Sequence, residues 1–143
     1  MNLTGHPEYR AAIFAATRGD HVAARAGFGN LVAQARTEGD IETLGFLLHN
    51  LGEVEARAGN HDQAHLLYRE AISLDPLSPQ PLLFYAQSLL RAFGRPGLVE
   101  EAIQEAEQRL NAPAWGQVPQ ELPRSYYERE FQLLREELRR AAP

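Results

Sequence analysis

Two histidines, His61 and His65, have a spacing that suits metal binding. They stand four residues apart in a segment expected to be helical, so their side chains share one helix face. Zinc needs at least three protein ligands, and no third ligand is evident, because Asp62 falls on another side of the helix. We therefore interpret both histidines as surface residues and predict no metal site and no cofactor.

The chain also lacks two common nucleophiles. It contains no Cys and no Lys, since all 14 basic residues are Arg, which excludes a thiolate nucleophile and a Schiff-base lysine. None of the four serines lies in a G-x-S-x-G turn. The "GFG" segment at 27–29 is expected in mid-helix with no preceding strand, so it is read as small residues that let helices approach, not as a phosphate loop. We predict that the protein is not an enzyme.

The charge distribution argues against nucleic acid as a partner. The formal net charge is -5, and a chain of this charge with no basic cluster is poorly suited to neutralising phosphates. The nearest approach to a basic patch is at Arg135, Arg139 and Arg140, but Glu136 and Glu137 between them offset the positive charge.

The apolar segments are too short for a membrane protein. No apolar run approaches the ~20 residues that span a bilayer, and the first ten residues have no apolar core of a secretory signal. We expect a cytoplasmic protein with no membrane partner. The Arg-only, Ala-rich composition suggests a bacterial source with a genome rich in G and C.

Helical periodicity runs through the whole chain, and no strand pattern is present. Turn residues and caps divide it into seven expected helices, with Asp20, Asp40, Asn60, Ser78 and Ser125 as predicted N-terminal caps. The expected helices lie at about 7–19, 20–37, 40–58, 60–75, 78–93, 98–111 and 125–143, with a Pro-rich loop at 112–124. The chain is therefore predicted to be all-α.

The first six helices form a repeat of helix hairpins. Ala24, Ala64 and Ala102 are 40 and 38 residues apart, each in the second helix of a pair. An aromatic follows the first two alanines four residues later, at Phe28 and Tyr68. Such self-similarity is typical of stacked helical repeats.

The middle hairpin resembles a tetratricopeptide repeat. It has the family's residues at the family's spacings: Leu48, Leu51, Gly52, Ala64, Tyr68, Ala71 and Pro76. Gly52 and Ala64 are small enough for two helices to approach closely, and Tyr68 is expected to fill the space between one hairpin and the next. Glu55 departs from the pattern, because an aromatic is usual at its position.

The resemblance implies a right-handed superhelical array of three hairpins, at about 7–38, 40–76 and 78–111. The first and third hairpins match the family pattern less well. The last expected helix carries an amphipathic stripe formed by Tyr127, Phe131, Leu134 and Leu138, which favours a capping helix at 125–143 over a partner-binding helix. Trp115 is expected to pack over the third hairpin; its alternative is an exposed interface anchor.

The resemblance also implies a function. Members of the family bind peptides in a concave groove, so we predict a non-catalytic interaction module, an adaptor or chaperone, with a protein or peptide partner. The alternative is a scaffold that self-associates into a homo-oligomer through the groove or the last helix. The inward positions carried over from the family are Tyr9, Ile13, Thr17, Phe46, His49, Asn50, Glu53, Arg57, Leu83, Gln87 and Arg91.

One subgroup of the family binds acidic chaperone tails through a clamp of Lys, Asn and Arg. Only Asn50 falls on a clamp position here, and the chain has no Lys. The mixed character of the predicted groove favours a partner with apolar anchors and some charge. Small bacterial secretion chaperones have a similar size and acidic charge, a resemblance at the level of fold and charge only.

Overall fold

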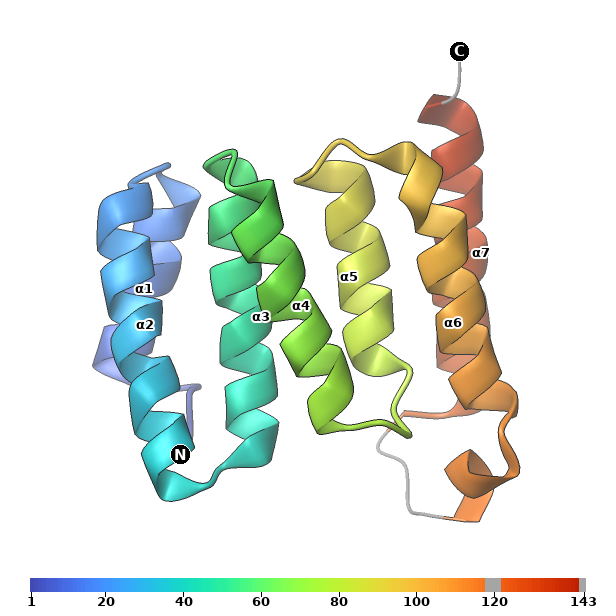
Figure 1. Cartoon of the computed structure of the whole chain (residues 1–143), viewed down its shortest axis with the longest axis horizontal. Coiled ribbons are helices and arrows are strands. Elements are labelled where there is room, and N and C mark those ends of the chain that lie inside the picture. Colours follow the sequence, from blue (N-terminus) through green and yellow to red (C-terminus); the bar gives the residue numbers. More distant parts are fainter. Residues whose placement is uncertain (118–121, 142–143) are drawn as a thin grey trace. The chain divides into compact units, whose positions relative to one another are not determined.

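A computed structural model describes residues 1–117 and 122–141. Within these residues the chain forms seven α-helices and two short 3-10 helices, with no strand, which confirms the all-α prediction (Figure 1). The α-helices are α1 (Pro7–Thr17), α2 (His21–Glu38), α3 (Ile41–Arg57), α4 (His61–Leu74), α5 (Gln80–Arg91), α6 (Val99–Asn111) and α7 (Arg124–Ala141). The 3-10 helices are η1 (Pro96–Leu98) and η2 (Pro113–Gln117).

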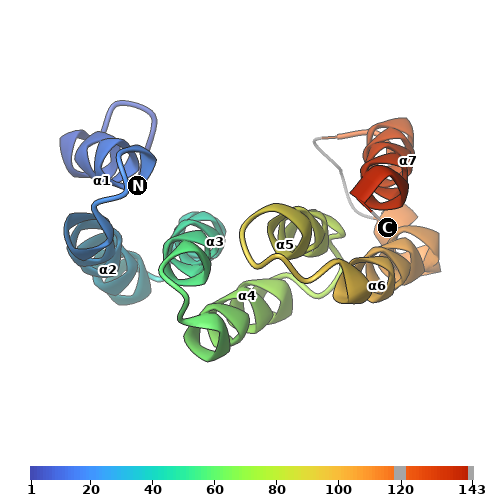
Figure 2. The ribbon, with the colours of Figure 1, turned by 90° about the horizontal axis from the view of Figure 1, so that it is seen from above.

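The helices form two compact units, Met1–Leu74 and Asp75–Pro143, here called the N-terminal and the C-terminal unit. The N-terminal unit holds the hairpins α1–α2 and α3–α4. Its first helices, α1 and α3, lie along one side, and its second helices, α2 and α4, lie along the other (Figure 2). The C-terminal unit holds the hairpin α5–α6, and α7 packs against both of its helices.

Side-chain caps begin several helices where the sequence predicts them. Asp20 Oδ1 accepts a hydrogen bond from the Ala23 amide at 3.1 Å, and Asp40 Oδ1 accepts one from the Thr43 amide at 3.2 Å. These bonds satisfy amides that have no partner inside the helix. Both predicted caps are therefore confirmed.

The predicted cap of α7 is wrong, because Ser125 lies inside the helix, which begins at Arg124. Arg124 donates a hydrogen bond to the Leu110 carbonyl at 3.1 Å and another to the Asn111 side chain, both at the end of α6. It also pairs with Glu128 one turn further along α7. Contacts to the end of the preceding α-helix thus accompany the earlier start, and a local cap motif does not reveal them.

Close helix contacts in the N-terminal unit occur at glycines. A Cβ on Gly52 would lie 2.8 Å from the ring of Tyr68, which is buried between α3 and α4. A Cβ on Gly27 would lie 2.9 Å from the Cβ of Ala12, so α1 and α2 meet at these two residues. Gly29 faces open space, so the close-approach interpretation of the "GFG" segment holds for Gly27 alone.

Glu55, which replaces the family's usual aromatic, is buried with 6% exposure. Its Oε1 accepts a hydrogen bond from Arg25 Nε of α2 at 2.7 Å, and its Oε2 accepts one from Asn60 Nδ2 at 3.3 Å. A buried carboxylate requires such partners, because it has lost its water. Glu55 therefore joins α2, α3 and the start of α4 through polar bonds in place of aromatic packing.

The amphipathic stripe of α7 faces inward. Tyr127, Phe131 and Leu134 are buried, and Leu138 is half-buried. The half-buried ring of Trp115, in η2, meets the ring of Tyr127 edge to face at 6.4 Å. These contacts support packing within the unit over an exposed anchor.

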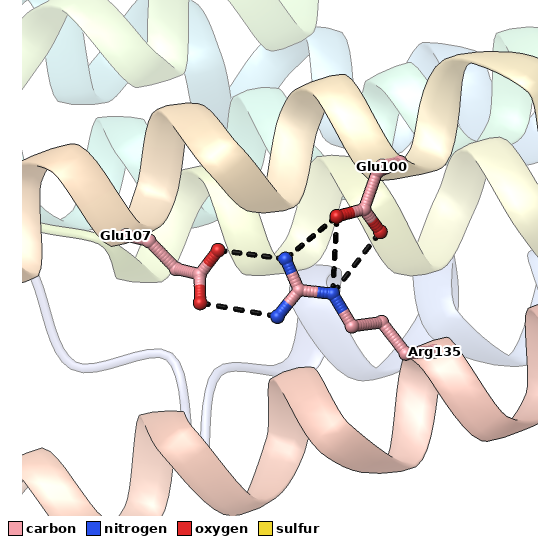
Figure 3. A network of polar contacts seen from close by, with 3 residues as sticks. All are labelled: Glu100, Glu107 and Arg135. Atoms are coloured by element: carbon pink, nitrogen blue, oxygen red, sulfur yellow. Dashed lines mark hydrogen bonds and ion pairs between the residues drawn. The ribbon is translucent and has the colours of Figure 1, made fainter.

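Charged residues fasten α7 to the α5–α6 hairpin. Arg135 lies between Glu100 and Glu107 of α6 and bonds to both carboxylates, with its shortest contacts at 2.7 Å (Figure 3). Arg91 of α5 makes a two-bond pair with Glu137 at 2.9 and 3.1 Å. Because both carboxylates bond to arginines, the pKa of Glu100 and that of Glu137 are lowered.

Candidate partner-binding groove

The N-terminal unit contains a groove of about 490 Å³ along α1 and α3. Its floor consists of apolar side chains from three helices: Ile13, Ala16, Phe28 and Val54. Its polar lining consists of Thr17 on α1, Asn50, Glu53 and Arg57 on α3, and His21 at the start of α2, and Gly19 of the α1–α2 turn also lines it. The groove thus combines an apolar floor with a polar wall.

Helical spacing brings these residues to one side of the unit. Ile13 and Thr17 are four residues apart on α1, and Asn50, Glu53 and Arg57 follow at steps of three and four on α3, so each set shares one helix face. The α1–α2 turn ends the groove at Gly19, whose φ of 79° is in the left-handed region that favours glycine.

The floor rests on the core of the unit. Phe28 is almost fully buried, and Tyr9 meets its ring edge to face at 6.0 Å. Ile13 remains 38% exposed, so apolar surface is available in the groove. Covering such surface is favourable by about 25 cal/mol per Å².

The polar wall is charge-balanced. Arg57 Nη2 donates a hydrogen bond to Glu53 Oε1 at 3.1 Å, a pair one helical turn apart. The side chains are 50% and 37% exposed, so water and solutes reach both groups. An exposed pair of this kind adds little stability, which leaves it free to exchange partners with a ligand.

A hydrogen bond crosses the groove at its other end. Asn50 Nδ2 on α3 donates to the Tyr9 hydroxyl on α1 at 3.0 Å. The open compartment therefore extends from this bond to the α1–α2 turn, past Ile13, Thr17 and Arg57.

The structure brings most of the predicted residues of the N-terminal unit together. Ile13, Thr17, Asn50, Glu53 and Arg57 line the groove, and Tyr9 closes one end of it. Phe46, 45% exposed, lies one turn before Asn50 on α3 and outside the lining.

His49 has a different environment from the groove residues. Its ring meets the ring of the buried Tyr68 at 5.5 Å. Burial lowers the pKa of His49, and the nearby Glu53 opposes that shift. His49 is therefore a packing residue on the side of α3 that faces Tyr68.

The three predicted residues of the third hairpin lie in the C-terminal unit and line no part of this groove. Leu83 is fully buried, and Gln87 is half-buried. Arg91 bonds to Glu137 of α7. Leu83 is therefore a core residue, and Arg91 joins α5 to α7 through an ion pair.

The repeat pattern did not indicate the groove residues Ala16, Gly19, His21, Phe28 and Val54. The repeat pattern predicts Phe28 only as a packing aromatic, and Val54 lies beside the inward stripe of α3. The pattern selects the inward face of each first helix, whereas the floor includes side chains from α2. The sequence signal that could indicate Ala16 is its spacing, because it lies three residues after Ile13 and next to Thr17 on the same face of α1.

The described residues hold no group of three or more His, Cys, Asp or Glu side chains that could bind a metal ion. In the same part of the chain, no helix is both long and apolar enough to span a bilayer.

Residues 46–88 match the family model of the tetratricopeptide repeat. The match covers α3 from Phe46, all of α4 and α5 as far as Ser88. No curated protein and no solved structure matched the sequence.

Proposed function

We propose that this tetratricopeptide repeat protein is a non-catalytic adaptor or chaperone that binds a segment of a partner polypeptide in the groove of the N-terminal unit. The repeat is typical of protein–protein interaction modules. One observation carries the proposal: five residues selected by the repeat pattern alone, Ile13, Thr17, Asn50, Glu53 and Arg57, line a single groove.

The chemistry of the groove suits a polypeptide. Ligand sites combine an apolar lining with a few polar groups that orient the ligand. Here Ile13 and Val54 provide part of the apolar lining, and Asn50 and Arg57 provide polar groups beside it. A side chain of the partner can enter between α1 and α3 while its backbone lies along the wall.

The test is affinity capture from an extract of the source organism, followed by binding measurements with the purified partner. Ile13→Glu places a charge on the floor, whereas Leu66→Glu is a matched control at a 63% exposed position of α4 outside the groove. We expect Ile13→Glu to weaken partner binding at least about tenfold, since a charge must lose its water there. Equal binding by both variants would remove the groove from the proposal.

Self-association is the alternative use of the same surface. The other surface considered for it, the stripe of α7, is occupied within the C-terminal unit, where Tyr127 and Phe131 are buried. Light scattering across a concentration series separates the two functions. A monomer at every concentration argues against self-association, and a dimer that Ile13→Glu dissociates argues for it.

A further inference from the structure

The wall of the groove presents one acceptor next to one donor. In the described part of the chain, Glu53 Oε1 accepts one hydrogen bond, which Arg57 donates through its terminal nitrogen Nη2. A carboxylate accepts through two oxygens, and a guanidinium carries five N–H donors. Both side chains therefore retain hydrogen-bonding capacity at an exposed position.

The charges of this pair balance each other. A carboxylate brought to Arg57 meets repulsion from Glu53, and an ammonium brought to Glu53 meets repulsion from Arg57, because only 3.1 Å separates the pair. A neutral peptide group has neither conflict. Its N–H matches an acceptor and its C=O matches a donor, so it can bond to both residues at once.

The compartment under this wall exposes little apolar surface. The Tyr9–Asn50 hydrogen bond crosses it at one end, and the turn at Gly19 bounds it at the other. The floor between these limits is apolar: Ile13 is exposed and Ala16 is half-buried, whereas Val54 and Phe28 are buried. Such a compartment fits one bulky apolar side chain better than a continuous run of them.

We propose that the groove recognises an uncharged, extended segment of a partner through one bulky apolar side chain and its adjacent peptide group. The side chain covers Ile13 and Ala16. The peptide N–H donates to Glu53, and the peptide C=O accepts from Arg57. This inference rests on the proposed function. It specifies that the groove recognises an apolar side chain and a peptide group of the partner, and not a charged side chain.

Salt dependence distinguishes this mode from ionic recognition. Salt screens an exposed charge pair, since the Debye length falls from about 30 Å at 0.01 M to about 8 Å at 0.15 M ionic strength. Binding through an apolar side chain and a neutral amide changes little over that range. We expect affinities to differ by less than about twofold between these salt concentrations.

The experiment is an NMR titration of the full-length, ¹⁵N-labelled protein with capped pentapeptides. The probe is acetyl-Gly-Ser-Phe-Ser-Gly-amide, and the matched peptide has Ala in place of Phe. Two further peptides replace the serines of the probe by Lys or by Glu. We expect the neutral Phe peptide to shift the amide signals of Ile13, Thr17, Asn50 and Arg57, and the Ala peptide to leave them in place.

Variants of the wall test the role of the peptide group. In E53Q/R57Q the side chains lose their charges but retain acceptors and donors, so we expect binding of the neutral Phe peptide within about threefold of the unmodified protein. E53A/R57A lacks both groups and should bind about five- to tenfold more weakly. Equal binding by these two variants would overturn the role assigned to the wall.

The peptides also separate this inference from the proposed function. If only a charged peptide shifts the groove signals, and does so more weakly as salt rises, the inference is wrong while the proposed function stands. If no peptide shifts them, the inference is again wrong. In that case equal partner binding by Ile13→Glu and Leu66→Glu shows that the proposed function fails as well.

Discussion

The two units differ in what lies beside the first helix of a hairpin. In the N-terminal unit, α1 and α3 are bridged by the Tyr9–Asn50 hydrogen bond and leave a groove beyond it. In the C-terminal unit, α7 packs directly on α5, and Arg91 is paired with Glu137. The same kind of hairpin therefore presents a groove or a filled interface, depending on the helix beside it.

The side chains of the neighbouring helix explain this difference. α1 lines the groove with Ile13, Ala16 and Thr17, none of which is aromatic. α7 contributes the buried aromatics Tyr127 and Phe131, which fill the corresponding interior of its unit. Whether a groove forms therefore depends on the volume of the side chains that the neighbouring helix contributes, as well as on which helix lies there.

The largest expected effect comes from removing the aromatic anchor of α7. Phe131→Ala should lower the free energy of unfolding by about 3–5 kcal/mol, because it leaves a cavity under a fully buried ring. Chemical denaturation gives the stability, and hydrogen exchange shows whether the amides of α7 lose protection. Leu133→Ala, 46% exposed on the same helix, is the control and should cost less than about 1 kcal/mol. Unchanged exchange in α7 would refute the anchoring role.

The next effect concerns the buried carboxylate that distinguishes the N-terminal unit. Arg25→Ala should destabilise the protein by about 2–3 kcal/mol, because Glu55 stays buried and loses its ionic partner. Glu55→Gln should cost less, about 1 kcal/mol, since an amide is cheaper to bury and Arg25 is 42% exposed to water. Equilibrium unfolding in urea compares the two variants. The reverse order would show that Glu55 does not depend on Arg25.

The glycine contact between α3 and α4 gives a matched pair of variants. Gly52→Ala should cost about 1–3 kcal/mol, since the new methyl group overlaps the ring of Tyr68. Gly45→Ala on the same helix meets no atom within 4 Å and should stabilise the protein by up to about 1 kcal/mol. Thermal unfolding measures both changes. A stabilising Gly52→Ala would mean that the two helices have room to spare.

The smallest effect comes from the ion pairs of the C-terminal unit. Arg135→Ala should cost about 1 kcal/mol at low salt and less at high salt, because its carboxylate partners are 36–44% exposed. Arg135→Lys retains the charge but lacks the planar guanidinium fork, so it should restore only part of the loss. Urea unfolding at two salt concentrations checks both expectations. A loss independent of salt would assign the effect to packing of the Arg135 stem.

The same ion pairs predict a dependence on pH. Hydrogen bonds from Arg135 and Arg91 hold the pKa of Glu100 and that of Glu137 below their usual value of 4.5. Depressed pKa values mean that the pairs stabilise the fold above pH 4.5 and lose that contribution as pH falls below it. Arg135→Ala should therefore flatten the loss of stability in acid. An identical acid profile for both proteins would contradict this account.

Much of the local structure follows from the sequence because helices depend on local patterns. The 3.6-residue period and the caps at Asp20 and Asp40 locate helices, and the repeat identifies Gly52 as a position of close helix approach and Tyr68 as a space-filling aromatic. The inward stripe of α3 was predictable for the same reason, since residues three and four apart share a face. The volume of the groove could not be predicted from the sequence, because it depends on how far apart α1 and α3 lie.

The sequence by itself determined the helices, their pairing into hairpins and the faces they present, because each follows from residues a few positions apart. Only the tertiary structure decided which faces are covered. In the tertiary structure Leu83 is buried, and Arg91 bonds to Glu137 of α7. Glu55 pairs with Arg25, which lies 30 residues away in the sequence. Periodicity defines a face, but whether water, another helix or a partner lies on it depends on residues distant in the chain.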